Sequence, residues 1–216
     1  ENRFTEEDLK NKKLATYITI DRAVSKKELA DFTGVIVNSV DDKDNWYFRE
    51  VKRLKVNSTE LVELVFNLWK EWLPKGLVCI GVEEKAFEDN LKPQLEREME
   101  IRQIWPEVKE LKDKGIRKEA RIEGRLVPRF EYKKIFLQKE PKDDTEYLID
   151  ELLRFPLSPH DDLSDAAQYQ QDIAEKIFVE DLSNKSQELW ERRIGDAMVQ
   201  KTIENNENED NKFSAI

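Results

Sequence analysis

Three aspartates lie within five positions of segment 155–166, which reads Phe-Pro-Leu-Ser-Pro-His-Asp-Asp-Leu-Ser-Asp-Ala. On a helix that begins here, Asp161 and Asp165 lie one turn apart, and Asp162 shares a side with Asp165. Because like charges this close repel each other, the pattern favours a cation among the carboxylates. A helix N-terminus would hold them ionised, as a hard divalent metal requires. The alternative is that they cap the helix and form a solvated acidic face.

The start of this helix is predicted from its capping residues. Ser158 suits the N-cap, Pro159 the first helical position, and Asp161 the third, where a carboxylate can return a capping bond. His160 could donate to a phosphate or position a water molecule, although it could equally satisfy the backbone of the loop.

Two further acids follow strand-like segments. Residues 14–20 are β-rich and end at Asp21, and the short apolar run 77–82 ends at Glu83. The helical pattern 61–73 lies between them, as in a crossover connection between parallel strands. If the two strands are neighbours, their carboxyl ends place both acids at one edge of the sheet, where such sheets usually carry their sites.

These acids together would form a cluster of hard oxygen ligands. Such ligands suit Mg²⁺ or Mn²⁺ and disfavour zinc, and two such ions could hold both oxygens of an in-line phosphoryl displacement. Two alternatives remain: Asp21 could merely begin a turn, and Glu84 could replace Glu83. The candidate metal ligands are Asp21, Glu83, Asp161, Asp162 and Asp165.

The remaining pattern predicts an α/β fold with a mixed sheet flanked by helices. A hairpin is expected around the polar turn 41–45. The other expected elements are strands 34–40, 46–56 and 135–137 and helices 87–99 and 144–154. We expect a polar lead-in over 1–13, the folded domain over 14–175, and a partly helical or disordered extension over 176–216.

The stretch 109–134 is basic, with ten Lys or Arg against five Glu or Asp, whereas the whole chain has a net charge of −10. This local excess favours phosphate contact, although a merely charged hairpin surface would give the same composition. The candidate DNA contacts are Arg117, Lys118, Arg121, Arg125 and Arg129.

Composition excludes several classes. The single Cys79 lies in an apolar run, where it is expected to pack as a small hydrophobe in a reducing compartment. With one Cys and one His in 216 residues, a structural zinc site is excluded. No apolar run approaches the roughly 20 residues that span a bilayer, and no signal peptide is visible. We therefore expect a protein that is neither membrane-bound nor secreted.

These motifs resemble the C-terminal nuclease domain of the large terminase subunit of tailed bacteriophages over about residues 14–175. The ending Phe-Pro…His-Asp-Asp-x-x-Asp-Ala is the most specific part. The matching segments are Thr19-Ile-Asp21, Asp31-Phe-Thr, Val82-Glu83-Glu-Lys-Ala-Phe87, Arg117-Lys-Glu-Ala-Arg121-Ile, Glu151-Leu-Leu-Arg-Phe155-Pro and His160-Asp-Asp-Leu-Ser-Asp165-Ala.

The resemblance implies a ribonuclease-H-like fold and a metal-dependent endonuclease that cuts concatemeric viral DNA during packaging in the host cytoplasm. Family roles fall on Asp21, Glu83 and Asp162, with Asp161 and Asp165 close by, and Asp31 matches a further family acid. The implied partners are double-stranded DNA, the packaging ATPase domain of the full-length protein, the portal and the small terminase subunit. No Gly-x-x-x-x-Gly-Lys-Ser/Thr loop occurs, so that ATPase is not part of this chain.

Two other functions remain open at this stage. One is a different ribonuclease-H-like phosphoryl transferase, such as a resolvase or an integrase. The other is a non-catalytic assembly module of the packaging motor, whose acids would face solvent.

Overall fold

The computed structural model describes residues 2–22, 32–84, 91–112, 115–141 and 143–175. Its described strands form one mixed sheet in the order β1-β7-β4-β3-β2-β5-β6, in which β3 alone runs against the others. The strands are β1 (Asn2–Phe4), β2 (Ala15–Arg22), β3 (Thr33–Val40), β4 (Trp46–Leu54), β5 (Leu77–Glu83), β6 (Val108–Leu111) and β7 (Ile135–Gln138).

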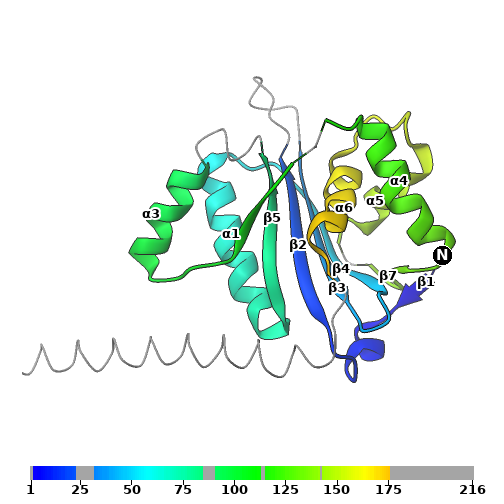
Figure 1. The fold of residues 1–216 in the computed structure, drawn as a ribbon, viewed down its shortest axis with the longest axis horizontal. Helices are drawn as coiled ribbons and strands as arrows, with labels where there is room; N and C mark the ends of the chain where they lie inside the picture. Colours follow the sequence, from blue (N-terminus) through cyan, green and yellow to red (C-terminus); the bar gives the residue numbers. More distant parts are fainter. Residues whose placement is uncertain (1, 23–31, 85–90, 113–114, 142, 176–216) are drawn as a thin grey trace, which may run out of the picture. The chain divides into compact units, whose positions relative to one another are not determined.

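Helices cover both faces of this sheet (Figure 1). One face carries α1 and α3, and the other carries α4, α5 and α6, of which α6 lies against β2 and β3. The helices are η1 (Glu6–Leu9), α1 (Ser58–Trp72), η2 (Leu73–Lys75), α3 (Lys92–Arg102), α4 (Lys118–Glu131), α5 (Thr145–Arg154) and α6 (Asp162–Ile173). The predicted α/β fold with a mixed sheet is confirmed.

The crossover between β2 and β5 forms as the sequence predicts. Asn57 caps α1, accepting hydrogen bonds from the backbone amides of Thr59 and Glu60 at 3.0 Å, while the Glu60 carboxylate accepts from the Asn57 amide at 2.8 Å. Gly76, with φ 82°, ends the following turn, and β5 then pairs in parallel with β2. The carboxyl ends of both strands therefore lie at the same edge of the sheet.

The two faces of β2 differ in chemistry. Ile18 and Ile20 point toward α1 and belong to an apolar core with side chains of β3, β5 and α3. Thr19 points toward α6 and donates to the Ala166 carbonyl at 2.6 Å. The Gln170 amide of α6 donates to the Thr19 hydroxyl at 2.9 Å and to the Ile36 carbonyl at 3.0 Å. Helix α6 is thus held on the sheet by buried hydrogen bonds, which fix its register more closely than apolar packing alone would.

One segment differs from expectation. Residues 2–9, predicted as a polar lead-in, form β1 and η1, and β1 extends the sheet by pairing in parallel with β7. Of the helix expected over 87–99, residues 87–90 lie outside the described residues, and the later part forms α3, where Pro93 occupies a first-turn position that tolerates proline. The extension 176–216 lies outside the described residues, so its predicted character stays a prediction.

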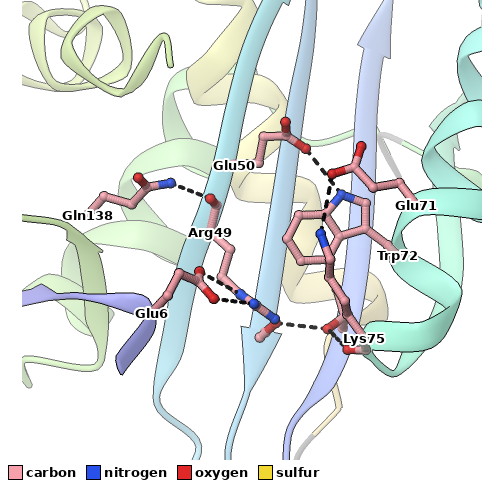
Figure 2. Close-up of polar contacts among 9 residues, drawn as sticks. Glu6, Arg49, Glu50, Glu71, Trp72, Lys75 and Gln138 are labelled. Atoms are coloured by element: carbon pink, nitrogen blue, oxygen red, sulfur yellow. Dashed lines mark hydrogen bonds and ion pairs between the residues drawn. The ribbon is translucent and has the colours of Figure 1, made fainter. Parts of the chain in front are cut away.

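Figure 2 shows how η1, β4 and α1 are joined. The Arg49 guanidinium of β4 forms an ion pair with Glu6 of η1 and lies over the Trp72 ring of α1, 4.8 Å from its centroid. The Trp72 indole N–H donates to the Glu50 carboxylate at 3.1 Å. Trp72 is therefore a core-edge residue, as its position on α1 predicts.

Two expectations from composition concern Cys79 and membrane-spanning segments. Cys79 is buried in β5, and burial raises the pKa of its thiol to about 11, so it packs as a small hydrophobe. Among the described residues, no helix combines the length and apolarity that a bilayer-spanning segment needs.

The β3–β4 hairpin depends on Asp41, whose carboxylate accepts hydrogen bonds from the Lys43 and Asn45 amides and the Tyr47 hydroxyl at 2.9–3.0 Å. Burial alone would raise the pKa of Asp41, but these bonds outweigh it and hold the pKa below the usual 3.8. The stabilisation is therefore present above pH 3.8 and is lost as the pH falls through the lower, folded-state pKa. We expect Asp41→Asn to lower the free energy of unfolding by about 1–3 kcal/mol at pH 7.

This loss should stay constant between pH 7 and pH 5 and shrink only in stronger acid, because wild-type Asp41 then takes up a proton. Urea unfolding of the wild-type and Asp41→Asn proteins at pH values from 7 down to 3 measures this loss in the free energy of unfolding. An equal loss at every pH down to 3 would contradict the role given to the Asp41 charge.

Candidate active site

One row of residues crosses the sheet at the carboxyl end of β2. Asp21 lies opposite Gly34 of β3, and Gly34 lies opposite Arg53 of β4. Residues that are directly opposite in antiparallel strands project from the same face, here the face that carries α6. A Cβ at Gly34 would lie 2.2 Å from the Asp162 carbonyl oxygen. The start of α6 therefore rests on Gly34, between Asp21 and Arg53.

Asp21 and Glu83 occupy neighbouring parallel strands, directly after the paired residues Ile20 and Val82. Both carboxyl groups are on nearly buried residues, which are 8% and 7% exposed. Burial raises the pKa of Asp21 well above its usual range, and the charges of Glu83, Asp165 and Asp162 raise it further. Acids on β5 and α6 thus lie close enough to Asp21 for their charges to raise its pKa.

The acids of α6 lie at its N-terminus, but the helix starts later than the sequence predicts. It begins at Asp162 with Asp161 as the N-cap residue, whereas Ser158 stays outside the helix and accepts from the His160 amide at 3.4 Å. The predicted N-cap at Ser158 is therefore wrong. Asp162 and Asp165 belong to the first turn and are 7% and 5% exposed.

The reason for the later start is Glu151 of α5, which caps α6 from outside. Its carboxylate accepts from the Leu163 amide at 3.1 Å and from the Ser164 amide and hydroxyl at 2.9 and 3.1 Å. This satisfies the amides that a local N-cap would otherwise bind. Glu151 is buried, and burial raises the pKa of its carboxyl group. Glu151 thereby fixes the position of the first turn and of its aspartates.

Lys118, the first residue of α4, enters the acidic cluster. Its ammonium forms ion pairs with Asp161 at 2.6 Å and with Asp165, while the Arg121 guanidinium lies 3.6 Å from Asp165. Burial alone would lower the pKa of Lys118, but the bonds to both aspartates raise it above the usual value. Burial raises the pKa of Asp165 even though Lys118 opposes that rise. The cluster thus holds its own counter-charge.

Solved structures with a similar fold include viral terminases. The human cytomegalovirus terminase nuclease domain matches with a TM-score of 0.55 and 15% identity, covering 80% of this chain and 90% of that one. The large terminase of the thermophilic bacteriophage D6E matches with a TM-score of 0.50 and 12% identity, covering 74% of this chain and 39% of that one. This chain has the fold of a terminase nuclease domain.

That fold is ribonuclease-H-like, as the sequence resemblance predicts. No family model matches the sequence, and no curated protein does. The matched region is a little over a third of the phage large terminase, so activities and partners of that whole protein are matters for proposal.

Within this fold, the predicted acids fall into three groups. Asp21, Glu83, Asp162 and Asp165 are brought together, as their mutual effect on the pKa of Asp21 indicates. Asp161 lies at the margin, half-buried and paired with Lys118. Asp31 lies outside the described residues, so its role stays a prediction.

His160 lies beside the cluster rather than within it. Its ring meets the Phe32 ring edge-on, with centroids 5.5 Å apart. Burial raises the pKa of Asp162, whereas the nearby Arg53 and His160 oppose that rise. Sequence reasoning found His160 but missed Arg53, which is distant in sequence from every quoted motif.

The predicted DNA contacts on α4 are mostly turned inward. Arg125 forms an ion pair with Asp172 of α6 at 2.6 Å, and Arg129 lies 3.7 Å from the centroid of the Trp46 ring and 3.3 Å from Asp44. Arg121 is buried at the acidic cluster. These three arginines hold α4 against its neighbours, whereas Arg117 is exposed and remains a predicted DNA contact.

The donor set can be tested for its fit to a divalent cation. Within the described part of the chain, no three Asp, Glu, His or Cys side chains are gathered closely enough to hold a metal ion as they stand. The Lys118 ammonium already occupies Asp161 and Asp165. The chemistry nevertheless fits, because the gathered donors are all carboxylate oxygens. Asp165 Oδ1 is buried and accepts no hydrogen bond, although the Arg121 guanidinium lies 3.6 Å from it.

Two residues of this site carry signals in the sequence. Gly34 opens a strand of β-branched residues, and a glycine in such a strand often marks a close backbone approach. Glu151 lies three residues after the buried Leu148, on the inward face of α5. An acid on an inward face requires a buried partner, which here is the first turn of α6.

Gly34→Ala should displace the start of α6, because the added Cβ would meet backbone atoms of Asp162 rather than a flexible side chain. We expect a loss of about 1–3 kcal/mol in the free energy of unfolding. Gly124→Ala on α4 is the matched control. A Cβ there meets no atom within 4 Å, so this change should be neutral or stabilising by about 0.5–1 kcal/mol. Urea unfolding of both variants measures the difference. Equal stabilities would contradict the close contact between Gly34 and the backbone of α6.

Asp21→Asn should stabilise the protein in a chelator. A raised native pKa means that the proton is held more tightly after folding, so wild-type stability falls as the pH rises through that pKa. Replacing the carboxylate removes this cost, and we expect a gain of about 0.5–2 kcal/mol at pH 7 that disappears in acid. Asp42→Asn, on an exposed turn residue, is the control and should change little. A destabilised Asp21→Asn protein at pH 7 would show that repulsion does not govern this cluster.

Proposed function

We propose that this chain is a divalent-metal-dependent endonuclease that cuts double-stranded viral DNA during genome packaging, in the cytoplasm of the infected cell. The observation that carries the proposal is the buried cluster of Asp21, Glu83, Asp162 and Asp165 at one edge of a sheet with the fold of a terminase nuclease domain. The acids come from three elements, and the charges of Glu83, Asp162 and Asp165 raise the cost of ionising Asp21. A structural core would gain nothing from such an arrangement, whereas a cation site requires it.

The residues that would hold Mg²⁺ or Mn²⁺ are Asp21, Glu83, Asp162 and Asp165, with two ions as the expected occupancy. Once bound, such ions lower the pKa of water and stabilise the charge that develops on a phosphate during hydrolysis. The β-strands hold Asp21 and Glu83 at fixed positions, and Glu151 fixes the turn that carries Asp162 and Asp165. The chain thereby supplies a rigid set of oxygen donors, as precise positioning requires.

Lys118 has a role at the same place. Without a metal, its ammonium neutralises Asp161 and Asp165 and limits the repulsion among the acids. A cation that binds Asp165 must compete with this ion pair. An ammonium pairs with a phosphate as it does with a carboxylate, so Lys118 stays a proposed DNA contact.

The packaging ATPase domain, the portal and the small terminase subunit are proposed partners by the same resemblance. A resolvase or integrase activity would use a similar acid cluster, so the two reactions must be separated by substrate. Cleavage of linear duplex DNA at least as fast as of branched DNA would support the packaging nuclease.

Nicking and linearisation of plasmid DNA with Mn²⁺ or Mg²⁺ test the proposal. We expect Asp21→Asn, Glu83→Gln and Asp162→Asn each to lose more than about 100-fold in rate, since even changes behind a metal ligand cost 10–100-fold. Asp42→Asn should cut normally. Mn²⁺ should also raise the melting temperature of the wild-type protein but not that of Asp21→Asn, because a ligand of the native state stabilises it. Cleavage that persists in excess chelator, or in Asp21→Asn, would overturn the proposal.

A further inference from the structure

A second group of side chains lies beside the acidic cluster and combines cations with aromatic rings. The Arg53 guanidinium lies 3.9 Å from the centroid of the Phe32 ring and 5.3 Å from that of the Tyr147 ring. Lys55, directly after the end of β4, places its ammonium 4.9 Å from the Phe32 centroid. His160 meets the same ring edge-on. Three side chains thus meet the Phe32 ring, and Tyr147 joins them through Arg53. We call Phe32, Arg53, Lys55, Tyr147 and His160 the cation–aromatic cluster.

Arg53 contacts two aromatic rings. Within the part of the chain that the structure describes, its guanidinium forms no ion pair, and its Nε is buried without a hydrogen-bond partner. Its backbone is fixed, because the Arg53 amide donates to the Asp144 carboxylate at 2.7 Å. The side chain is therefore held in place by stacking and retains its capacity to donate hydrogen bonds.

The position of the cluster relative to the acids follows from strand register. Arg53, Gly34 and Asp21 are opposite one another on three adjacent strands, and Asp162 rests on Gly34 between the outer two. Two strand spacings separate the Arg53 and Asp21 backbones by about 10 Å. A nucleic-acid strand whose scissile phosphate lies at the acids would therefore bring a neighbouring phosphate to Arg53.

Four cations of α4 already face carboxylates. Lys118 and Arg121 face Asp165, and Arg125 and Arg129 bind Asp172 and Asp44. Arg53 differs because aromatic rings hold it instead of carboxylates. Stacking leaves the planar edge of a guanidinium open to the bidentate contact that suits a phosphate.

We propose that the cation–aromatic cluster is a phosphate-backbone binding site, in which Arg53 and Lys55 hold the DNA strand next to the acidic cluster while Phe32 and Tyr147 orient the Arg53 guanidinium. This inference rests on the proposed nuclease function, whose DNA substrate it places on β4 as well as α4. The site contacts backbone only, so it contributes to binding without selecting a sequence.

A purely structural role predicts something different. Arg53 opposes the raised pKa values of Asp162 and Glu151, and it could serve only to balance their charges. In that case its replacement would alter stability and leave the salt dependence of DNA binding unchanged. Each phosphate contact that is lost should instead reduce the slope of log K against log salt concentration by about 0.9.

The experiment measures binding of the whole chain to a fluorescent duplex in excess chelator, so that no cleavage occurs, across a range of salt concentrations. Arg53→Gln should reduce the salt slope by about 0.9 and weaken binding roughly eightfold at 0.1 M salt. Arg53→Lys, which keeps the charge but loses the planar fork, should weaken binding less. The matched control is Lys70→Gln on α1, which removes one exposed charge on the opposite face of the sheet and should leave the slope unchanged.

Thermal unfolding of each variant shows whether it folds. Should Arg53→Gln fail to fold, Lys55→Gln provides the test, because this exposed side chain can be changed without opening the core and should also reduce the slope. A slope equal to wild type in a folded Arg53→Gln or Lys55→Gln protein would overturn the inference, as would wild-type protein that binds no DNA at low salt.

Cleavage of plasmid DNA by the wild-type protein, assayed in parallel, separates this inference from the proposed function. A reduced slope without wild-type cleavage would support the binding site and oppose the nuclease. Cleavage with an unchanged slope would do the reverse.

Discussion

Helix α6 can rest on the sheet as it does because Gly34 has no side chain where the Asp162 carbonyl lies. That contact places the first turn of α6 over the row formed by Asp21 and Arg53. The buried hydrogen bonds of Thr19 and Gln170 further along the helix fix its rotation. Acids from β2 and α6, which are distant in sequence, therefore lie close together at fixed positions. The acidic cluster is a consequence of this close approach of backbone to backbone.

Such a cluster has an energetic cost that the surrounding residues limit but do not remove. Lys118 and Arg121 bring positive charge to Asp165, and Glu151 occupies the amides at the start of α6. The pKa values of Asp21, Asp162 and Asp165 are raised all the same. In the metal-free protein the acidic cluster therefore lowers the free energy of unfolding. The apolar core on the other face of the sheet offsets this loss. One face of the sheet carries the acidic cluster and the other carries the apolar core, so a single sheet provides both the candidate site and the stability that it requires.

Local patterns were enough to predict much of this arrangement. The period of α1, its Asn57 cap and the apolar run of β5 are encoded within short windows, and the crossover they define brings Asp21 and Glu83 to one edge. The predicted start of α6 was wrong because the helix is capped by Glu151, a residue on another helix. No local rule detects a cap that comes from a distant part of the sequence. The lead-in 1–13 was misjudged for a similar reason, since the edge of β7 pairs with β1 across more than a hundred residues.

The basic stretch 109–134 shows what composition alone leaves open. Its charge excess is real, but periodicity places Lys118, Arg121, Arg125 and Arg129 on one face of α4, and that face meets the acids of α6 and of the β3–β4 turn. A charge count along the chain cannot reveal that a partner in another segment neutralises it. By contrast, Arg53 lies on β4, which the sequence analysis identified only as a strand, and aromatic rings orient its guanidinium. Arg129 also stacks on a ring, but it pairs with Asp44 as well, so the contacts of each side chain, and not its charge alone, decide which cations face a phosphate.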